Sequence, residues 1–275
     1  MLNSGARINE IQNSEESKRL LAAQRQTYAD AKLVDLVNVC VCLLLPLGVT
    51  VAQIYLNVSS EVIILLWIAT MVAGICLPKR SERLVEEAAA MQQRFDSSVF
   101  GIKFENASRD DAMVASRAKR YYERHGGDEG DQGLDDWYSI EIEDMRAGDA
   151  ISRCQRQNAE WTMRQLRRSV DIEICIASLV AGVLVTLIVL SGAAILNFSF
   201  LSSIAEWTVQ RVVGGLQSAR KLELVANTLS SYRLSSRDNI IRTQDKIFEC
   251  RKAPYLVPDW LYDLFKEHDE TATAS

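Results

Sequence analysis

The chain has 275 residues, 48% of them hydrophobic, and a formal net charge of −5. The length allows one or two domains, and the negative charge argues against nucleic acid as a partner, since nucleic-acid binding calls for a basic face. The apolar residues are pooled into two blocks, at about 37–77 and 174–216, while most charged residues lie outside them. This uneven distribution predicts membrane spans.

The reactive residue types do not form a recognisable catalytic or metal-binding pattern. The six cysteines include no CxxC pair, and His125 and His268 are far apart in the sequence. No nucleophile elbow, phosphate-binding loop or dinucleotide fingerprint occurs. We therefore predict that the protein is not an enzyme and holds neither a metal nor a resident cofactor.

The first segment of the chain, residues 1–32, carries mixed charge and no apolar core, so we do not expect a signal peptide there. Asn13 and Glu16 resemble a capping box at the start of a helix. Residues 37–55 then predict a first span of 19 residues with a kink at Pro46. Residues 62–77 predict a second span of roughly 24 Å, which is short for a hydrocarbon core of about 30 Å.

The central polar segment contains a basic run. Ser108 and Asp111 predict the start of a helix that continues to about Arg124, before a glycine-rich acidic loop at 126–133. The run consists of Arg117, Lys119, Arg120 and Arg124, and Trp137 and Tyr138 follow it. These residues fit either a site for a phosphate-bearing ligand with base stacking or a solvated helix face. Arg164, Arg167 and Arg168 precede the next span and predict a topological anchor.

The second apolar block predicts spans at 174–196 and 198–216. The last of these contains Glu206, Gln210 and Arg211. A charged residue costs about 2.5–3.5 kcal/mol at the bilayer centre, and Glu206 and Arg211 lie about 140° apart around a straight helix. We predict a pore or gating role for these three residues; a position in the membrane interface and a buried contact within the bundle are the alternatives.

Beyond the fourth span, Leu222, Val225, Leu229 and Tyr232 recur at helical spacing. The stripe predicts a helix that packs on a partner, which is either another part of the same chain or a second copy of it.

The distribution of positive charge predicts the topology. Of the 31 Lys and Arg residues, five lie in 1–32, 16 in 79–171 and nine in 217–275, which leaves only Arg211 inside a span. The positive-inside rule places all three segments in the cytoplasm, with both termini cytoplasmic in a multi-pass membrane protein. We predict an all-α membrane protein with four transmembrane helices in two hairpins and a helical cytoplasmic assembly. The predicted parts are an N-terminal helix (1–32), a first hairpin (33–78), a central domain (79–170), a second hairpin (171–216) and a C-terminal helical segment (217–275).

Three polar stretches of the chain resemble the SMODS-associated four-transmembrane effector family of bacterial anti-phage systems. They are residues 11–32 (IQNSEESKRLLAAQRQTYADAK), 154–167 (CQRQNAEWTMRQLR) and 244–265 (QDKIFECRKAPYLVPDWLYDLF). Residues 93–100 (QRFDSSVF) fit less closely, and Trp137-Tyr138 precede the central block. Thr162 stands where the family's pattern has an acidic residue.

The resemblance implies an effector that senses a cyclic di- or oligonucleotide from a cognate nucleotidyltransferase and damages the inner membrane, as a homo-oligomeric pore. It implies no catalytic residues. The ligand-binding candidates in the matched blocks are Gln24, Arg25, Gln155, Arg156, Gln157, Asn158, Arg242, Gln244 and Arg251; contacts that hold the cytoplasmic helices together are the alternative role. A constitutive channel or transporter and a non-permeabilising membrane scaffold or receptor are the alternative functions.

Overall fold

The structure is a computed structural model of the chain, and it describes residues 2–46, 48–49, 52, 59–126, 133–138, 140–191, 202–231, 236–252 and 256–257. The regular elements within these residues are all helical, which confirms the predicted all-α class for this part of the chain. The elements are α1 (Gly5–Gln12), α2 (Glu15–Val39), η1 (Cys40–Leu44), α4 (Ser60–Phe100), α5 (Asp111–Arg124), η2 (Ile140–Ile142), α6 (Ala147–Ser191), α7 (Ser202–Ser231) and α8 (Arg237–Arg251).

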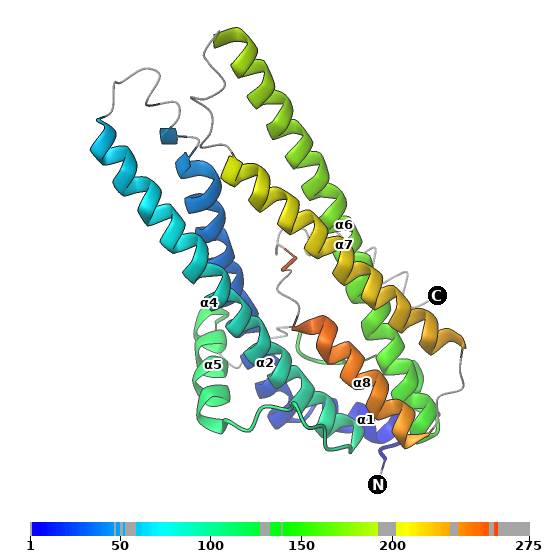
Figure 1. Cartoon of the computed structure of the whole chain (residues 1–275). Coiled ribbons are helices and arrows are strands. Elements are labelled where there is room, and N and C mark those ends of the chain that lie inside the picture. The colour runs from blue at the N-terminus through cyan, green and yellow to red at the C-terminus, as the bar shows by residue number, and fades with distance from the viewer. Residues whose placement is uncertain are drawn as a thin grey trace.

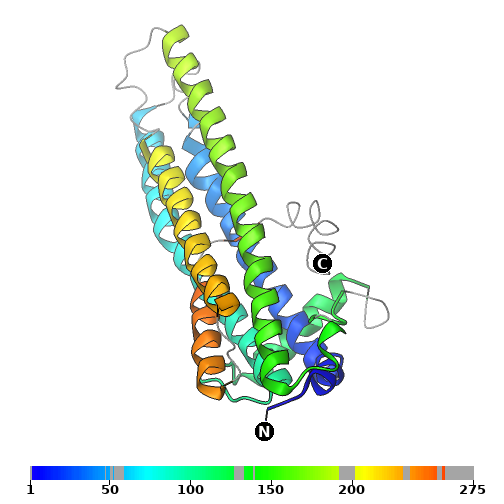
Figure 2. The same ribbon diagram turned by 90° about the vertical axis from the view of Figure 1, so that its right-hand side faces the viewer.

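Four long helices lie side by side in an elongated bundle (Figure 1). α2 packs on α4, and α6 packs on α7. The short helices α1, α5 and α8 gather at the end of the bundle that holds the N-terminus, and Figure 2 shows the same grouping from the side. We call this end the polar half and the opposite end the apolar half. α4 and α6 run through both halves without interruption.

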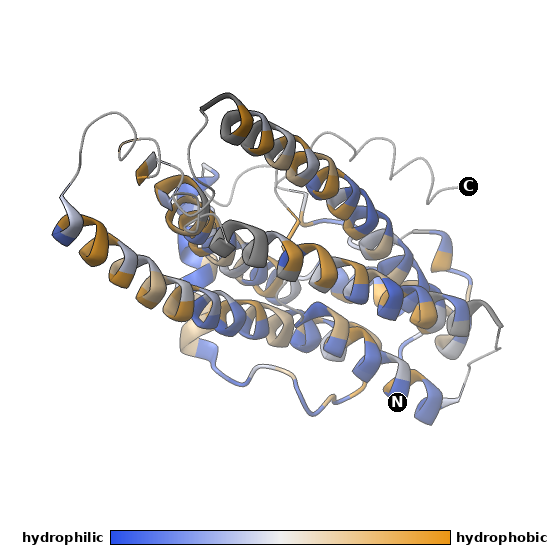
Figure 3. Ribbon diagram, turned by 45° about the horizontal axis from the view of Figure 1, so that its top comes forward, coloured by the Kyte–Doolittle hydropathy of each residue, from blue (hydrophilic) through white to orange (hydrophobic). Residues whose placement is uncertain are grey.

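Hydrophobic residues are frequent along the helices of the apolar half (Figure 3), and many of their side chains are exposed. Of the described helices, α4 is the one that is long and apolar enough to cross a membrane, and only 6% of its most apolar segment is buried. Leu65, Trp67 and Met71 of this segment are all more than half exposed. Parts of the first, third and fourth predicted spans lie outside the described residues. The structure therefore supports a membrane location, and the four-span topology stays a prediction.

The polar half has its own hydrophobic core. Leu21 from α2, Phe95 and Phe100 from α4, and Ile151 from α6 are fully buried in it, and Ile240 brings α8 onto the same core. Such a core removes apolar side chains from water at about 25 cal/mol per Å². It therefore fixes these four helices relative to one another outside the apolar half.

Two helix starts differ from the prediction. The N-cap of α2 is Ser14, whose hydroxyl accepts a hydrogen bond from the Ser17 amide at 3.4 Å, while Asn13 bonds to Asp136 instead. The N-cap of α5 is Asp110, which accepts from the Met113 amide at 2.8 Å. Both caps are residues that satisfy the free amides of a first turn. The predicted end of α5 at Arg124 is confirmed.

The chain has a local irregularity at the predicted kink. Residues Cys40–Leu44 form a π-helical turn, closed by a hydrogen bond from the Leu45 amide to the Cys40 carbonyl, directly before Pro46. Proline lacks an amide hydrogen and its ring clashes with the carbonyl four residues earlier. The wider π turn accommodates the proline without breaking the helix.

The stripe on α7 packs within the chain where the structure describes its side chains. Leu222 is buried in one cluster with Leu166 of α6, and Val225 is buried in another with Ala159 of α6 and Ile247 of α8. The intramolecular alternative therefore holds for Leu222 and Val225. The Leu229 side chain and all of Tyr232 lie outside the described part of the chain.

Candidate functional site

A buried carboxylate, Asp96 of α4, is the centre of a polar network inside the polar half. Its Oδ1 accepts a hydrogen bond from the Tyr138 hydroxyl at 2.6 Å. Its Oδ2 accepts from Gln244 Nε2 and from an Arg251 guanidinium nitrogen, each at 2.6 Å. Asp96 is fully buried and the Arg251 side chain is 5% exposed. One charge pair therefore joins α4 to the C-terminal end of α8 inside the protein.

Three glutamine amides extend the network from α4 to α6 and α8. Gln244 Nε2 donates to Gln93 Oε1, and Gln155 Nε2 donates to Gln244 Oε1, both at 3.0 Å. Gln155 also donates to the Ile240 carbonyl at 3.0 Å. We call Gln93, Asp96, Tyr138, Gln155, Gln244 and Arg251 the Asp96 network. It ties three helices together through directional contacts.

Some buried polar atoms of the Asp96 network have no hydrogen-bond partner. Within the described residues, Gln93 Nε2, Gln155 Oε1 and Arg251 Nε are buried and lack a hydrogen-bond partner, and so does Gln24 Oε1 on α2. A buried polar atom without a partner costs about 1–3 kcal/mol. The polar half therefore keeps unused donors and acceptors that a rearrangement or a polar ligand can satisfy.

The pKa shifts of the side chains around Asp96 favour a structural role for the network over a catalytic one. Burial lowers the pKa of the Arg251 guanidinium, but the charge and hydrogen bond of Asp96, together with the nearby Tyr138 and Tyr28, outweigh burial and raise the net pKa. Burial and the Asp96 charge raise the pKa of the Tyr138 hydroxyl well above its usual 10. Burial also raises the pKa of the Cys154 thiol, which makes it a poor nucleophile. Tyr138 and Arg251 thus stay hydrogen-bond donors at neutral pH.

The structure brings some of the sequence candidates together. Gln155, Gln244 and Arg251 meet in the Asp96 network. Gln93 and Asp96 were not among the candidates, although the stretch 93–100 contains them, and Tyr138 was considered only for base stacking beside the basic run. The four family-like stretches 93–100, 137–138, 154–167 and 244–265 thus contribute to one buried site. No local sequence signal marks Asp96, because its partners Tyr138, Gln244 and Arg251 lie 42, 148 and 155 residues away along the chain.

Arg25 and Trp137 lie beside this site and contact each other. The Arg25 guanidinium is 5.6 Å from the centre of the Trp137 ring and donates to the Gly133 carbonyl at 2.6 Å and to the Tyr121 hydroxyl at 3.3 Å. Trp137 packs edge-on against Phe95. Their contacts fix the segment at 133–138 against α2, α4 and α5.

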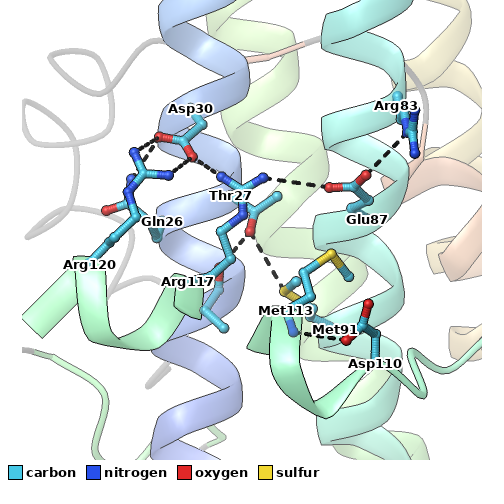
Figure 4. Close-up of polar contacts among 11 residues, drawn as sticks. Gln26, Thr27, Asp30, Arg83, Glu87, Met91, Asp110, Met113, Arg117 and Arg120 are labelled. Atoms are coloured by element: carbon cyan, nitrogen blue, oxygen red, sulfur yellow. Dashed lines mark hydrogen bonds and ion pairs between the residues drawn. The ribbon is translucent and has the colours of Figure 1, made fainter. Parts of the chain in front are cut away.

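Most of the basic run on α5 surrounds one carboxylate, Asp30 of α2 (Figure 4). Arg117 pairs with Asp30, and Arg120 donates to both Asp30 oxygens at 2.9 and 3.1 Å. Arg124 reaches Asp30 at 4.0 Å, and Arg117 also lies 3.7 Å from Glu87 of α4. Part of the charge of the run is therefore balanced within the protein, by Asp30 and Glu87.

The remaining ligand-binding candidates lie away from the Asp96 carboxylate contacts. Lys119 is exposed and pairs with Glu123 at 3.7 Å, and Arg156 pairs with Glu160 at 2.7 Å, each along its own helix. Gln157 and Asn158 are half-buried on α6, and Arg242 is exposed on α8.

Arg211 forms an ion-pair cluster that joins three long helices. Its Nε donates to Glu173 of α6 at 2.7 Å, and another guanidinium nitrogen donates to Asp35 of α2 at 3.0 and 2.7 Å. All three side chains are less than a quarter exposed. The structure gives Arg211 the bundle contact that the sequence left as an alternative, while the Glu206 and Gln210 side chains lie outside the described part.

A shallow hollow of about 290 Å³ lies on the surface between α4 and the start of α5. It is lined by Arg94, Ser97, Lys103, Phe104, Ala107, Ser108, Arg109 and Asp111. None of the sequence candidates lines it. Arg94 is paired with Asp111 at 2.5 Å, so the charge of one of the basic residues in the lining is neutralised within the protein. Elsewhere in the described chain, no group of three or more His, Cys, Asp or Glu side chains could hold a metal ion.

The fold and the site define a class: an all-helical protein with an apolar helix suited to a membrane and a polar half held by buried charge and amide contacts. Residues 6–275 match the SMODS-associating 4TM effector domain, and the chain belongs to that family. It is also 24% identical to a probable CBASS effector molecule of Bacillus cereus (strain VD146), over 95% of this chain and 94% of that protein. No solved structure matches the chain.

Proposed function

We propose that this protein is a membrane effector of CBASS anti-phage defence. A cyclic di- or oligonucleotide, made by a cognate nucleotidyltransferase, binds its cytoplasmic part and favours a homo-oligomer that permeabilises the inner membrane. The ligand must bind the active state better than the resting state, because a ligand with equal affinity for both shifts nothing. Family membership and the similarity to the probable CBASS effector of Bacillus cereus support this proposal.

The proposed mechanism rests on one observation: the Asp96 network includes residues of α4 and α6, the two helices that run through both halves. Asp96 and Gln155 lie on helices of 41 and 45 residues that continue into the apolar half. A 45-residue helix is about 68 Å long and is a stiff element. A ligand that rearranges the unsaturated polar contacts in one half therefore moves the helices in the other half.

The proposed topology has four spans with both termini in the cytoplasm. In a variant without native cysteines, a single cysteine at Asn57 or Asn197 should react with a membrane-impermeant thiol reagent added to the periplasm. Cysteines at Ser108 and Ser235 should react only after the inner membrane is opened. The expectation rests on the 30 of 31 basic residues outside the spans. Periplasmic labelling at Ser108 would exclude this topology.

Cyclic-nucleotide binding should raise the thermal stability of the purified full chain. A ligand that binds only the folded state adds about 2.7 kcal/mol at a hundredfold excess over its Kd. In a panel of cyclic di- and trinucleotides, we expect at least one compound to shift the unfolding midpoint, while the linear nucleotides of the same composition do not. A folded protein that responds to no compound would contradict ligand activation.

Loss of membrane potential on co-expression with the cognate nucleotidyltransferase separates the three candidate functions. The proposed effector depolarises cells with the active synthetase and not with a catalytically inactive one. A constitutive channel depolarises them in both cases, and a scaffold in neither. The same cells provide the control for expression, because the protein level can be compared between the two synthetases.

A further inference from the structure

The helix α5 has one face on the bundle and a neighbouring face that is basic. Val114, Ala118 and Tyr121 are buried, and α5 packs on α2. Arg117, Arg120 and Arg124 follow at a spacing of three and four residues, so they share a second face of the helix. We call these three residues the α5 arginine face.

The α5 arginine face points toward the apolar half. In Figure 4, Arg117 and Arg120 extend from α5 to Asp30 in the direction in which α4 passes from Met91 through Glu87 to Arg83. This direction leads along α4 to its apolar segment.

The arginines also lie at the depth of a membrane surface. Asp30 is three residues before Leu33 on α2, and Leu33 and Leu36 are 57% and 58% exposed. Three residues of helix rise by about 4.5 Å. The polar layer of a bilayer is about 5–8 Å thick on each side, from a total of about 40–45 Å around a core of about 30 Å. If α4 crosses the membrane as proposed, the arginine face lies in the headgroup layer.

The cluster has more cationic donors than its own carboxylates accept. Asp30 has about four acceptor positions, and it receives contacts from Gln26 at 2.8 Å, from Arg117, and twice from Arg120. Arg124 only approaches to 4.0 Å. Arg120 and Arg124 remain 42% and 52% exposed. The group formed by the three arginines, Asp30 and Glu87 has a formal net charge of +1. The exposed side chain of Arg83, which pairs with Glu87, raises this net charge to +2.

We propose that the α5 arginine face binds the phosphate of an anionic phospholipid in the inner leaflet of the membrane that holds α4. Guanidinium groups match phosphate oxygens through paired N–H donors, and Asp30 holds the arginines in place beneath the lipid. The proposal rests on the membrane insertion of α4 within the proposed function, but it does not require nucleotide binding. Bound lipid fastens α5, and through it α2, to the bilayer surface.

The test is the retention of phosphatidylglycerol by the purified full chain, measured by native mass spectrometry against phosphatidylcholine. Each basic residue near an anionic surface contributes about a fivefold gain in binding. Arg120→Gln/Arg124→Gln should therefore weaken phosphatidylglycerol binding by roughly 25-fold and leave phosphatidylcholine binding unchanged. The control Arg7→Gln/Lys119→Gln removes the same charge from exposed positions outside the face and should bind phosphatidylglycerol as the parent does.

Two further arms keep the proposal falsifiable. Arg120→Lys/Arg124→Lys retains the charge, so it should recover most of the phosphatidylglycerol binding. If the double glutamine variant does not fold, Arg124→Gln alone replaces it and should weaken phosphatidylglycerol binding by about fivefold. Unchanged phosphatidylglycerol binding in a folded glutamine variant overturns the proposal. A glutamine variant that loses the thermal shift with cyclic nucleotides but keeps phosphatidylglycerol binding also overturns it, because the face is then a nucleotide site.

Discussion

Replacing Arg251 by methionine should lower the free energy of unfolding by about 3–5 kcal/mol, because it leaves Asp96 buried without its counter-charge. Asp96 would keep the hydrogen bonds from Tyr138 and Gln244, but neither donor neutralises a carboxylate. Chemical denaturation of the purified chain in detergent, followed by helical circular dichroism, measures the change.

A double-mutant cycle separates this charge effect from lost packing. Asp96→Asn/Arg251→Met removes both charges and should be more stable than Arg251→Met alone, since no buried charge remains unpaired. Arg7→Met, which breaks the exposed pair with Glu10, should cost less than about 1 kcal/mol. If Arg251→Met were as mild as Arg7→Met, the Asp96 network would not hold α8 in place.

The fold could be predicted where a pattern along the sequence decides the structure. Helical spacing and apolar runs predicted an all-helical chain, and the Gly126-Gly127 pair in the sequence predicted the end of α5 correctly at Arg124. The exact start of a helix depends on which of several neighbouring polar side chains bonds to the first free amides. Ser14 and Asp110 are the N-caps in the structure, and each lies next to a residue of the predicted capping pair.

The candidate site could be predicted only in part, because its contacts join residues far apart in the sequence. The basic run on α5 showed surplus charge, but its carboxylate partner Asp30 lies 87 residues before Arg117. Asp96 was one of 36 acidic residues, and nothing in its local sequence marks it as buried. The family-like stretches contain Gln155, Gln244 and Arg251, and the structure shows how these residues meet: Gln244 and Arg251 bond to Asp96, and Gln155 bonds to Gln244.

Arg211 is the position where the structure changes an expectation about stability. A lone arginine in a span predicts that its removal favours insertion by about 2.5–3.5 kcal/mol. Arg211 instead bonds to Asp35 and Glu173, so its removal leaves two largely buried carboxylates without a partner. Arg211→Leu should therefore destabilise the folded chain, by roughly 1–3 kcal/mol after allowance for the partial exposure of the cluster.

The triple variant Asp35→Asn/Glu173→Gln/Arg211→Leu tests whether charge is the cause. It removes the whole cluster and leaves no unpaired charge, so its free energy of unfolding should lie closer to that of the parent than Arg211→Leu does. An equal loss in both variants would mean that Arg211 stabilises the bundle through packing alone.

The same triple variant tests the proposed gating role without the complication of misfolding. If Arg211 takes part in opening a water path, a folded triple variant should keep the thermal shift with the activating cyclic nucleotide and lose most of the dye leakage seen on co-expression with the active synthetase. The ligand response should persist because Arg211 makes its contacts with Asp35 and Glu173, away from the Asp96 network. A triple variant that inserts, binds ligand and still leaks as fully as the parent would show that the Arg211 cluster joins α2, α6 and α7 and has no part in permeabilisation.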